Sequence, residues 1–439
     1  MFDAGTYFQI TLGQFRQITF SVSQQHNSST FKWHGGHMQQ LLLLDEISDD
    51  LMNPTFPIMS DDEFCYQDIE SELEAYLEIE LDKFETMGIV PITVSDINCK
   101  WKYSSALQKS IRRGYSEDAV KYAMVFHSLD SAAFWTRLVV ISYEEIGLGG
   151  VLELALTLIA AKSKVWRKKV GEVKVLQYIV KMLAEAVKDR TCCDYMQVLW
   201  YHPRKYKEMN ALKTATQEEL SDFALSERNT TSFRTCSAWL LAGTDRFENK
   251  QLPLRSGSRE KFCAIVSQMK IPGIVKYISM RGMTACRYPM SLVYPFLWQM
   301  KQKSLYINVE RTVFPTGRDY IGGLPSESWD QYVREGKKSF AYFSKACEPV
   351  NEWLAAKGIT SSDARVAAIG AAVFIMEGAL LDRRLSFEGA SEIYELEEKY
   401  DYENVGLSLD DGRTLVGMIE ANSDILRQSR IRVVVEERV

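Results

Sequence analysis

Three clusters of basic residues hold the side chains most suited to chemistry in this chain of 439 residues. The second and third clusters also contain aromatic residues, Trp166 in one and Tyr201 and Tyr206 in the other. The basic residues of the three clusters are Lys109, Arg112 and Arg113; Lys162, Lys164, Arg167, Lys168, Lys169 and Lys174; and Arg204, Lys205 and Lys207. Cations pair with phosphates and aromatic rings stack on bases, a combination typical of proteins that bind single strands or junctions. Each cluster alone is more often a solvated helix face, and only the three together favour nucleic acid.

Other kinds of chemical site are poorly supported. The sequence has no Gly-x-x-x-x-Gly-Lys-Ser/Thr, so it offers no phosphate-binding loop of the P-loop type. His34 and His37 form the single paired-histidine motif, and zinc needs three or four ligands, so a glycine-rich turn is the preferred interpretation. No Ser/His/Asp or Cys/His pairing is evident. We therefore expect no catalytic residue, no metal and no cofactor, and a protein that is not an enzyme.

Charge is distributed unevenly along the chain. Residues 1–99 hold 3 Lys/Arg and 17 Asp/Glu, residues 100–346 hold 39 and 23, and residues 347–439 hold 10 and 18. A basic middle between two acidic ends predicts that the middle contacts either a polyanion or its own acidic flanks.

Composition places the chain among folded proteins. Hydrophobic residues make up 46% and charged residues 25%, which excludes disorder throughout. The most apolar stretch, Val151 to Ala161, is interrupted by Glu153 and is shorter than the ~20 residues of a membrane span. The eight cysteines show no pairing rhythm, and no basic residue precedes Arg16 as in a signal peptide. We expect a cytoplasmic protein without a membrane partner.

The hydrophobic pattern predicts a mainly α protein with a small mixed α/β region at its N-terminus. Residues 5–45 alternate like two short strands with a polar loop at Gln24 to Thr30, and Asp68 to Phe84 reads as an acidic amphipathic helix. From Ser104 onward the period is helical. Further helices are expected at 131–146, 151–168, 171–189, 217–227, 231–242, 258–268, 272–280, 289–302, 326–346, 348–357, 363–381 and 387–399. The acidic end that follows is assigned no helix.

One stretch, from Ser105 to Leu148, resembles a known family. Its motifs are Ser105-Ala106-Leu107-Gln108-Lys109-Ser110-Ile111-Arg112-Arg113-Gly114, Asp118-Ala119-Val120-Lys121-Tyr122 and Arg137-Leu138-Val139-Val140-Ile141-Ser142-Tyr143-Glu144-Glu145-Ile146-Gly147-Leu148. They are similar, in order and spacing, to the C-terminal region of the MgsA/RarA family. These replication-associated AAA+ ATPases are related to clamp loaders and to the Werner-helicase-interacting protein. The resemblance weakens through residue 200, and Glu145 stands where the family has Asp.

The resemblance implies a helical collar that oligomerises and serves DNA replication and repair. It does not imply ATPase activity, because the family's ATPase module lies upstream, where this chain is acidic. The collar-motif residues are Lys109, Arg112, Arg113, Arg137, Glu144 and Glu145. For these residues we favour packing and ion pairing over DNA contact, with Arg137 and the Glu144-Glu145 pair bonded to different neighbours.

With this resemblance, the chain divides into four parts. They are an acidic N-terminal region at 1–99, a collar-like helical domain at 100–210, a second helical region at 211–346 and an acidic helical region at 347–439.

The leading functional hypothesis is a non-enzymatic accessory protein of DNA replication or repair, of a kind that a phage encodes. It would be a homo-oligomeric helical scaffold that binds single-stranded or forked DNA, or a replisome protein. Its acidic N-terminal segment would compete for the basic face. The alternative is an adaptor or inhibitor that binds a host protein through the acidic helix. An enzyme with no nameable catalytic set is the third possibility.

Overall fold

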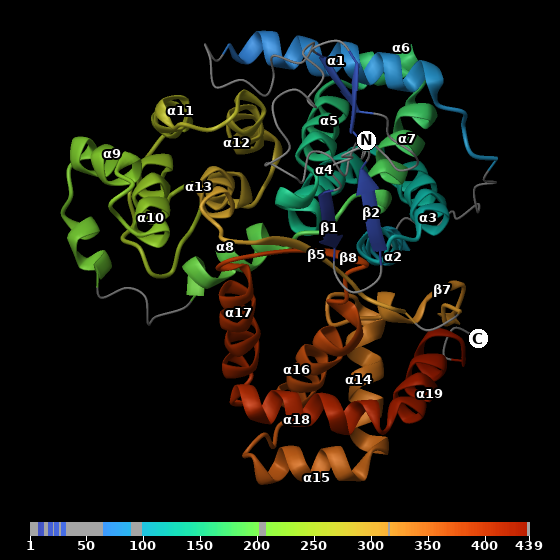
Figure 1. Ribbon diagram of the computed structural model, residues 1–439. Coiled ribbons are helices and arrows are strands. Elements are labelled where there is room, and N and C mark those ends of the chain that lie inside the picture. Colours follow the sequence, from blue (N-terminus) through green and yellow to red (C-terminus); the bar gives the residue numbers. More distant parts are fainter. Residues whose placement is uncertain are drawn as a thin grey trace, which may run out of the picture.

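The structure, a computed structural model, describes most of the chain. It covers residues 65–88, 99–201, 208–314 and 317–436, together with the backbone of four short strands between residues 8 and 31. Within these residues the chain forms 19 α-helices and four two-stranded sheets (Figure 1). The prediction of a mainly α protein is confirmed. No helix of the described residues is long and apolar enough to cross a membrane.

The N-terminal strands form two hairpins. Strand β1 (Phe8–Leu12) pairs antiparallel with β2 (Arg16–Phe20), as the alternating pattern predicts. Strand β3 (Val22–Gln25) pairs with β4 (Ser28–Phe31), so the expected loop from Gln24 to Thr30 is wrong. Ladder hydrogen bonds are made by backbone groups, so a run of Ser and Gln residues does not prevent pairing.

The larger hydrophobic core belongs to a body of thirteen helices. These are α1 (Tyr66–Lys83), α2 (Lys100–Arg112), α3 (Ser116–Leu129), α4 (Ser131–Ile141), α5 (Val151–Lys162), α6 (Lys164–Val170), α7 (Glu172–Glu185), α8 (Thr191–Tyr201), α9 (Gln217–Leu225), α10 (Thr231–Ala242), α11 (Arg259–Gln268), α12 (Gly273–Ala285) and α13 (Met290–Gln302). Helix α8 was not expected, because it is buried on most sides and so shows no amphipathic period. Residues of both expected helical regions, 100–210 and 211–346, contribute to this core, although Phe340 and Phe343 belong to a second, smaller one.

Helix α1 confirms the predicted acidic amphipathic helix. It buries Ile69, Leu73, Leu77 and Leu81, which recur every four residues and so lie on one face. Figure 1 shows α1 lying across one end of the body, where it packs on α5, α7 and α12.

The smaller core belongs to a C-terminal lobe, drawn orange and red in Figure 1. Its helices are α14 (Arg334–Ala346), α15 (Glu348–Ala356), α16 (Ser362–Val373), α17 (Ala390–Asn404), α18 (Leu409–Glu420) and α19 (Ser423–Val434). The last two occupy the acidic end that was assigned no helix. Ser408 caps α18 ahead of Asp410 and Asp411, and acidic residues are favourable at a helix N-terminus. Leu415 is fully buried in the lobe.

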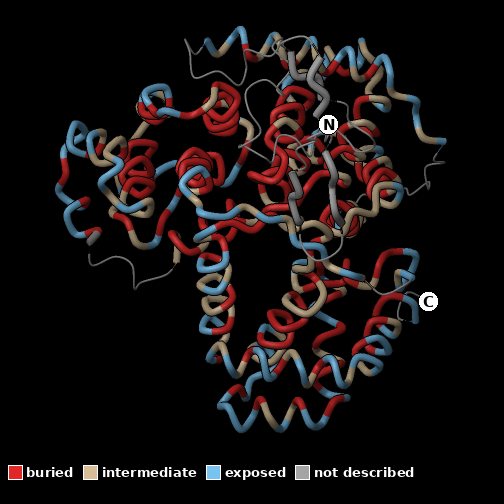
Figure 2. Tube along the Cα trace, in the orientation of Figure 1, coloured by how far each residue is buried: buried red, intermediate tan, exposed pale blue. Residues whose placement is uncertain are grey.

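Two strands cross between body and lobe. Strand β5 (Ile307–Arg311) pairs antiparallel with β8 (Arg383–Phe387), and a small hairpin joins β6 (Tyr320–Ile321) to β7 (Leu324–Pro325). Figure 2 shows buried residues gathered inside both parts, with exposed residues along the outer helices. The pairing of β5 with β8 therefore joins the body to the lobe.

Candidate nucleic-acid interface

The predicted basic residues separate into a buried set and an exposed set. The collar-motif residues Lys109 and Arg112 are buried, with only 2% and 1% of their surface exposed. Lys164, Lys168 and Lys169 are exposed on α6. Only the exposed set has access to a polyanion.

Glu145 is the centre of the buried set. Its carboxylate accepts from Arg112 Nε at 2.7 Å and Nη2 at 2.5 Å, from Arg190 Nη1 at 3.1 Å and from Gln108 Nε2 at 2.6 Å. Burial alone would raise the pKa of Glu145, but the Arg112 and Arg190 guanidinium groups outweigh it and hold that pKa well below its usual range. Glu145 is therefore an ionised, fully bonded structural group.

The rest of the collar motif fastens the body to the C-terminal lobe. Lys109 Nζ lies 2.5 Å from Asp330 Oδ2, and burial lowers the pKa of Lys109 while Asp330 opposes that shift. Arg112 donates to the Gly378 carbonyl, and Arg113 Nη2 donates to the Glu377 carbonyl at 2.6 Å.

The ring of Phe374 reinforces this contact between body and lobe. Lys109 Nζ and Arg112 Cζ each lie 5.4 Å from its centroid, and Arg190 Cζ lies 5.8 Å from it, so three cations lie close to one aromatic ring. The structure thus gives the collar-motif cations partners within the chain.

Arg137 and Glu144 correct one expectation. They bond each other, with Arg137 Nη2 3.1 Å from Glu144 Oε2, whereas Glu145 bonds different neighbours, Arg112 and Arg190, as expected. Residues seven apart lie on the same side of a helix, and Ser142–Ile146 forms a π-helical turn at the end of α4. Both side chains are long enough to meet there.

The exposed set owes its position to a break between two helices. The single helix expected at 151–168 ends at Lys162, and Ser163 begins α6 by accepting a hydrogen bond from Trp166 N at 3.1 Å. Among the described residues, Lys164, Lys168 and Lys169 form no ion pair, and Lys174 is half-buried on α7. Short helix α6 therefore presents three ammonium groups that no described carboxylate neutralises.

Lys162 has partners on the acidic helix. Its Nζ lies 2.6 Å from Glu70 Oε2 and 3.0 Å from Glu74 Oε1, and these partners raise the pKa of Lys162 against the effect of its partial burial. Trp166 Nε1 donates to Glu78 Oε1 at 2.9 Å. The acidic flank thus contacts the edge of the basic cluster.

Arg167 is a correction to the predicted phosphate-contacting set. It is buried, its guanidinium lies 4.3 Å from the centroid of the Trp135 ring, and Nη1 donates to the Ala160 carbonyl at 2.7 Å. Its Nε lies 3.4 Å from Glu172 Oε1. Burial lowers the pKa of Arg167, and Glu172 opposes that change. Arg167 closes the end of α5 and is not free for a backbone phosphate.

Some predicted positions lie outside the described residues. These are Arg204, Lys205 and Lys207 of the third cluster and the histidines His34 and His37. In the part that is described, no group of three or more His, Cys, Asp or Glu residues is arranged to hold a metal.

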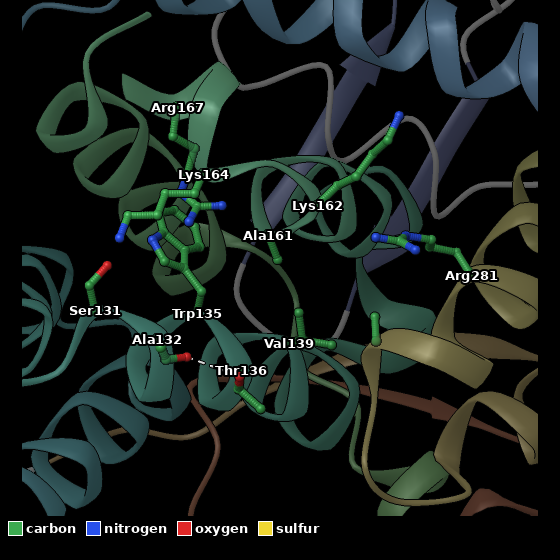
Figure 3. A pocket seen from close by; sticks show the side chains of 11 residues that line it. Ser131, Ala132, Trp135, Thr136, Val139, Ala161, Lys162, Lys164, Arg167 and Arg281 are labelled. Atoms are coloured by element: carbon green, nitrogen blue, oxygen red, sulfur yellow. Dashed lines mark hydrogen bonds between the residues drawn. The ribbon is translucent and has the colours of Figure 1, made fainter. Parts of the chain in front are cut away.

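A cationic pocket adjoins α6 (Figure 3). It has a volume of about 320 Å³ and lies between α4, α12 and the junction of α5 with α6. Its lining residues are Ser131, Ala132, Trp135, Thr136, Val139, Ala161, Lys162, Lys164, Arg167, Arg281 and Ala285. Four of these are cations, and none of the described lining residues is acidic. Sequence reasoning missed Arg281, because it belongs to no basic cluster and reaches the pocket only through the packing of α12 on α5.

Ser131, His127 and Glu172 meet beside this pocket. His127 Nε2 lies 2.9 Å from Ser131 Oγ and 3.2 Å from Glu172 Oε1. In a hydrolytic triad the carboxylate bonds the ring nitrogen that faces away from the serine, whereas here both partners share Nε2. Glu172 also accepts from Trp135 Nε1 at 3.3 Å. The geometry is that of a carboxylate fixing its neighbours, without a relay that would activate Ser131.

Comparisons with known proteins identify no relative of this chain. No family model matches it, no curated protein matches it, and no solved structure matches it.

Proposed function

We propose that this chain is a non-enzymatic nucleic-acid-binding protein that contacts the sugar–phosphate backbone through α6. The observation that carries the proposal is the row of exposed lysines, Lys164, Lys168 and Lys169, which lack ion-pair partners among the described residues and border a cationic pocket. Ammonium groups of this kind release counterions when they meet phosphates, which supplies sequence-independent affinity.

The size of the surface favours a single strand. Helix α6 has 7 residues, so it is only ~10 Å long and spans a few phosphates. Val165 is 80% exposed beside the lysines and offers an apolar surface to an unpaired base. A single strand is flexible enough to bring both its phosphates and its bases onto such a short element.

The setting of DNA replication or repair rests on the resemblance of residues 105–148 to the collar family. The proposal includes the self-association that this resemblance implies. Because the buried collar-motif residues lie between body and lobe, we propose that the chains associate through a different surface.

The adaptor hypothesis is less well supported. The apolar face of α1 is buried in the body, and Glu70, Glu74 and Glu78 of its polar face bond Lys162 and Trp166. A partner protein would have to compete with these contacts.

The decisive experiment is binding of a labelled single-stranded oligonucleotide across a range of salt concentrations. The variant Lys164→Gln/Lys168→Gln/Lys169→Gln should flatten the slope of log affinity against log salt by about 2, at ~0.7 per lost contact on a single strand.

A matched control separates contact from net charge. Lys213, Lys270 and Lys345 are also exposed, and changing these three to Gln alters the net charge equally. The control should keep the slope of the unmodified protein. Absence of binding to any oligonucleotide by the unmodified protein would eliminate the proposal and favour the adaptor.

A further inference from the structure

The charge balance inside the pocket separates its four cations into two pairs. Lys162 is held by Glu70 and Glu74, and Arg167 lies against Glu172. Lys164 and Arg281 have no carboxylate partner among the described residues. The pocket therefore carries about two positive charges that no described side chain neutralises.

Arg281 has an unsatisfied hydrogen-bond donor that an anion could bind. Its Nη1 donates to Thr284 Oγ1 at 3.2 Å, but its buried Nε has no hydrogen-bond partner among the described residues. An unsatisfied buried donor costs free energy, so such a group calls for an acceptor. Figure 3 shows Arg281 and Lys162 on one side of the pocket and Lys164, Arg167 and Trp135 on the other.

The amount of charge favours one kind of phosphate. A phosphate monoester carries about −1.5 to −2 at neutral pH, whereas each internal phosphate of a strand carries a single charge. Two uncompensated cations match the monoester better. Ser131 and Thr136 also line the pocket, but the Thr136 Oγ1 proton is donated to the Ala132 carbonyl at 2.9 Å, so the phosphate oxygens are left to the cations.

The size of the pocket also favours the end of a strand. A volume of about 320 Å³ is at the small-molecule end of the range of binding pockets. An internal nucleotide would need room for the chain to enter and leave, whereas a terminal group needs only one opening. Lys164 belongs both to the pocket and to the exposed row on α6, so it connects the two surfaces.

We propose that this pocket binds the terminal phosphate monoester of a nucleic-acid strand whose backbone follows α6. This inference rests on the proposed function, and it adds a preference for phosphorylated ends. The carboxylates of α1 that hold Lys162 compete with the phosphate for that ammonium group.

The test compares three oligonucleotides of one sequence that carry a 5′-phosphate, a 3′-phosphate or hydroxyl groups at both ends. One phosphorylated form should bind the full chain ~10-fold tighter, since charge-assisted hydrogen bonds are the strong ones. Arg281→Gln should reduce its affinity to that of the hydroxyl-ended form. Lys164→Gln, at an exposed position that does not affect folding, should reduce the preference as well.

Two further variants serve as controls. Arg287→Gln removes an exposed arginine close to the same helix and should leave the preference intact. Glu74→Gln frees Lys162 from one competitor and should increase the preference.

The outcomes separate this inference from the proposed function. Equal affinity for all three oligonucleotides, or a preference that survives Arg281→Gln, overturns the strand-end site while nucleic-acid binding stands. Binding of inorganic phosphate that depends on Arg281, with no oligonucleotide bound, overturns both in favour of a free phosphate ester.

Discussion

The buried Glu145 carboxylate offers the sharpest test of how the collar motif functions. Glu145→Gln keeps the shape of the side chain and removes its charge, which leaves Arg112 and Arg190 facing a neutral amide in a site with 0% exposure. Removing one member of a buried ion pair costs ~3–5 kcal/mol, because its partners stay buried without compensation. We expect the free energy of unfolding to fall by about that amount.

The adjacent residue supplies a matched control. Glu144→Gln makes the same chemical change in a pair whose side chains, Arg137 and Glu144, are 25% and 16% exposed. A solvent-accessible pair contributes ~0.2–1 kcal/mol. Urea unfolding followed by far-ultraviolet circular dichroism measures both variants under one set of conditions.

The pH dependence adds a second signature. The folded protein holds the pKa of Glu145 below the value of 4.5 that it has when unfolded, so its contribution is present above that pH and is lost as the pH falls below it. The difference between Glu145→Gln and the unmodified protein should therefore shrink in acid. A loss equal to that of Glu144→Gln, or weaker DNA binding with unchanged stability, would refute a structural role for Glu145.

Two other positions give clear expectations. Burial raises the pKa of Glu153 to about 7, so the folded protein becomes less stable as the pH rises from 4.5 to 7. Glu153→Gln should match the unmodified protein near about pH 4 and exceed its free energy of unfolding above about pH 8 by up to ~3 kcal/mol. Urea unfolding at both pH values checks this, and a less stable variant at the higher pH would contradict it. Gly282 lies where an added Cβ would overlap both Ser291 Cβ and the Tyr143 hydroxyl. Gly282→Ala should lower the thermal midpoint with a cost of ~1–3 kcal/mol, whereas Gly417→Ala, where no described atom lies within 4 Å of the added Cβ, should not.

The sequence by itself determined the class of the protein and most of its helices. Period and capping residues are local properties, so an acidic helix with one apolar face could be predicted at Asp68 to Phe84 and is present as α1. Charge counts likewise predicted that the basic middle meets a polyanion or its acidic flanks. In the structure, Lys162 of the basic middle forms ion pairs with Glu70 and Glu74 of the N-terminal acidic flank.

Only the tertiary structure decided which cations are accessible. Arg167, Lys168 and Lys169 are adjacent in the sequence and look equivalent there, yet Arg167 is buried under Trp135 while its neighbours are exposed. Burial depends on what packs against a residue, and that partner comes from a different helix. Local spacing therefore could not single out Arg167.

Contacts between residues distant in the sequence could not be predicted from it either. Lys109 bonds Asp330 across 221 residues, β5 pairs with β8, and Arg281 reaches the pocket from α12. Periodicity describes one face of one element and carries no information on which faces meet. The ion network and the cationic pocket exist because tertiary packing brings together side chains that are distant in the sequence.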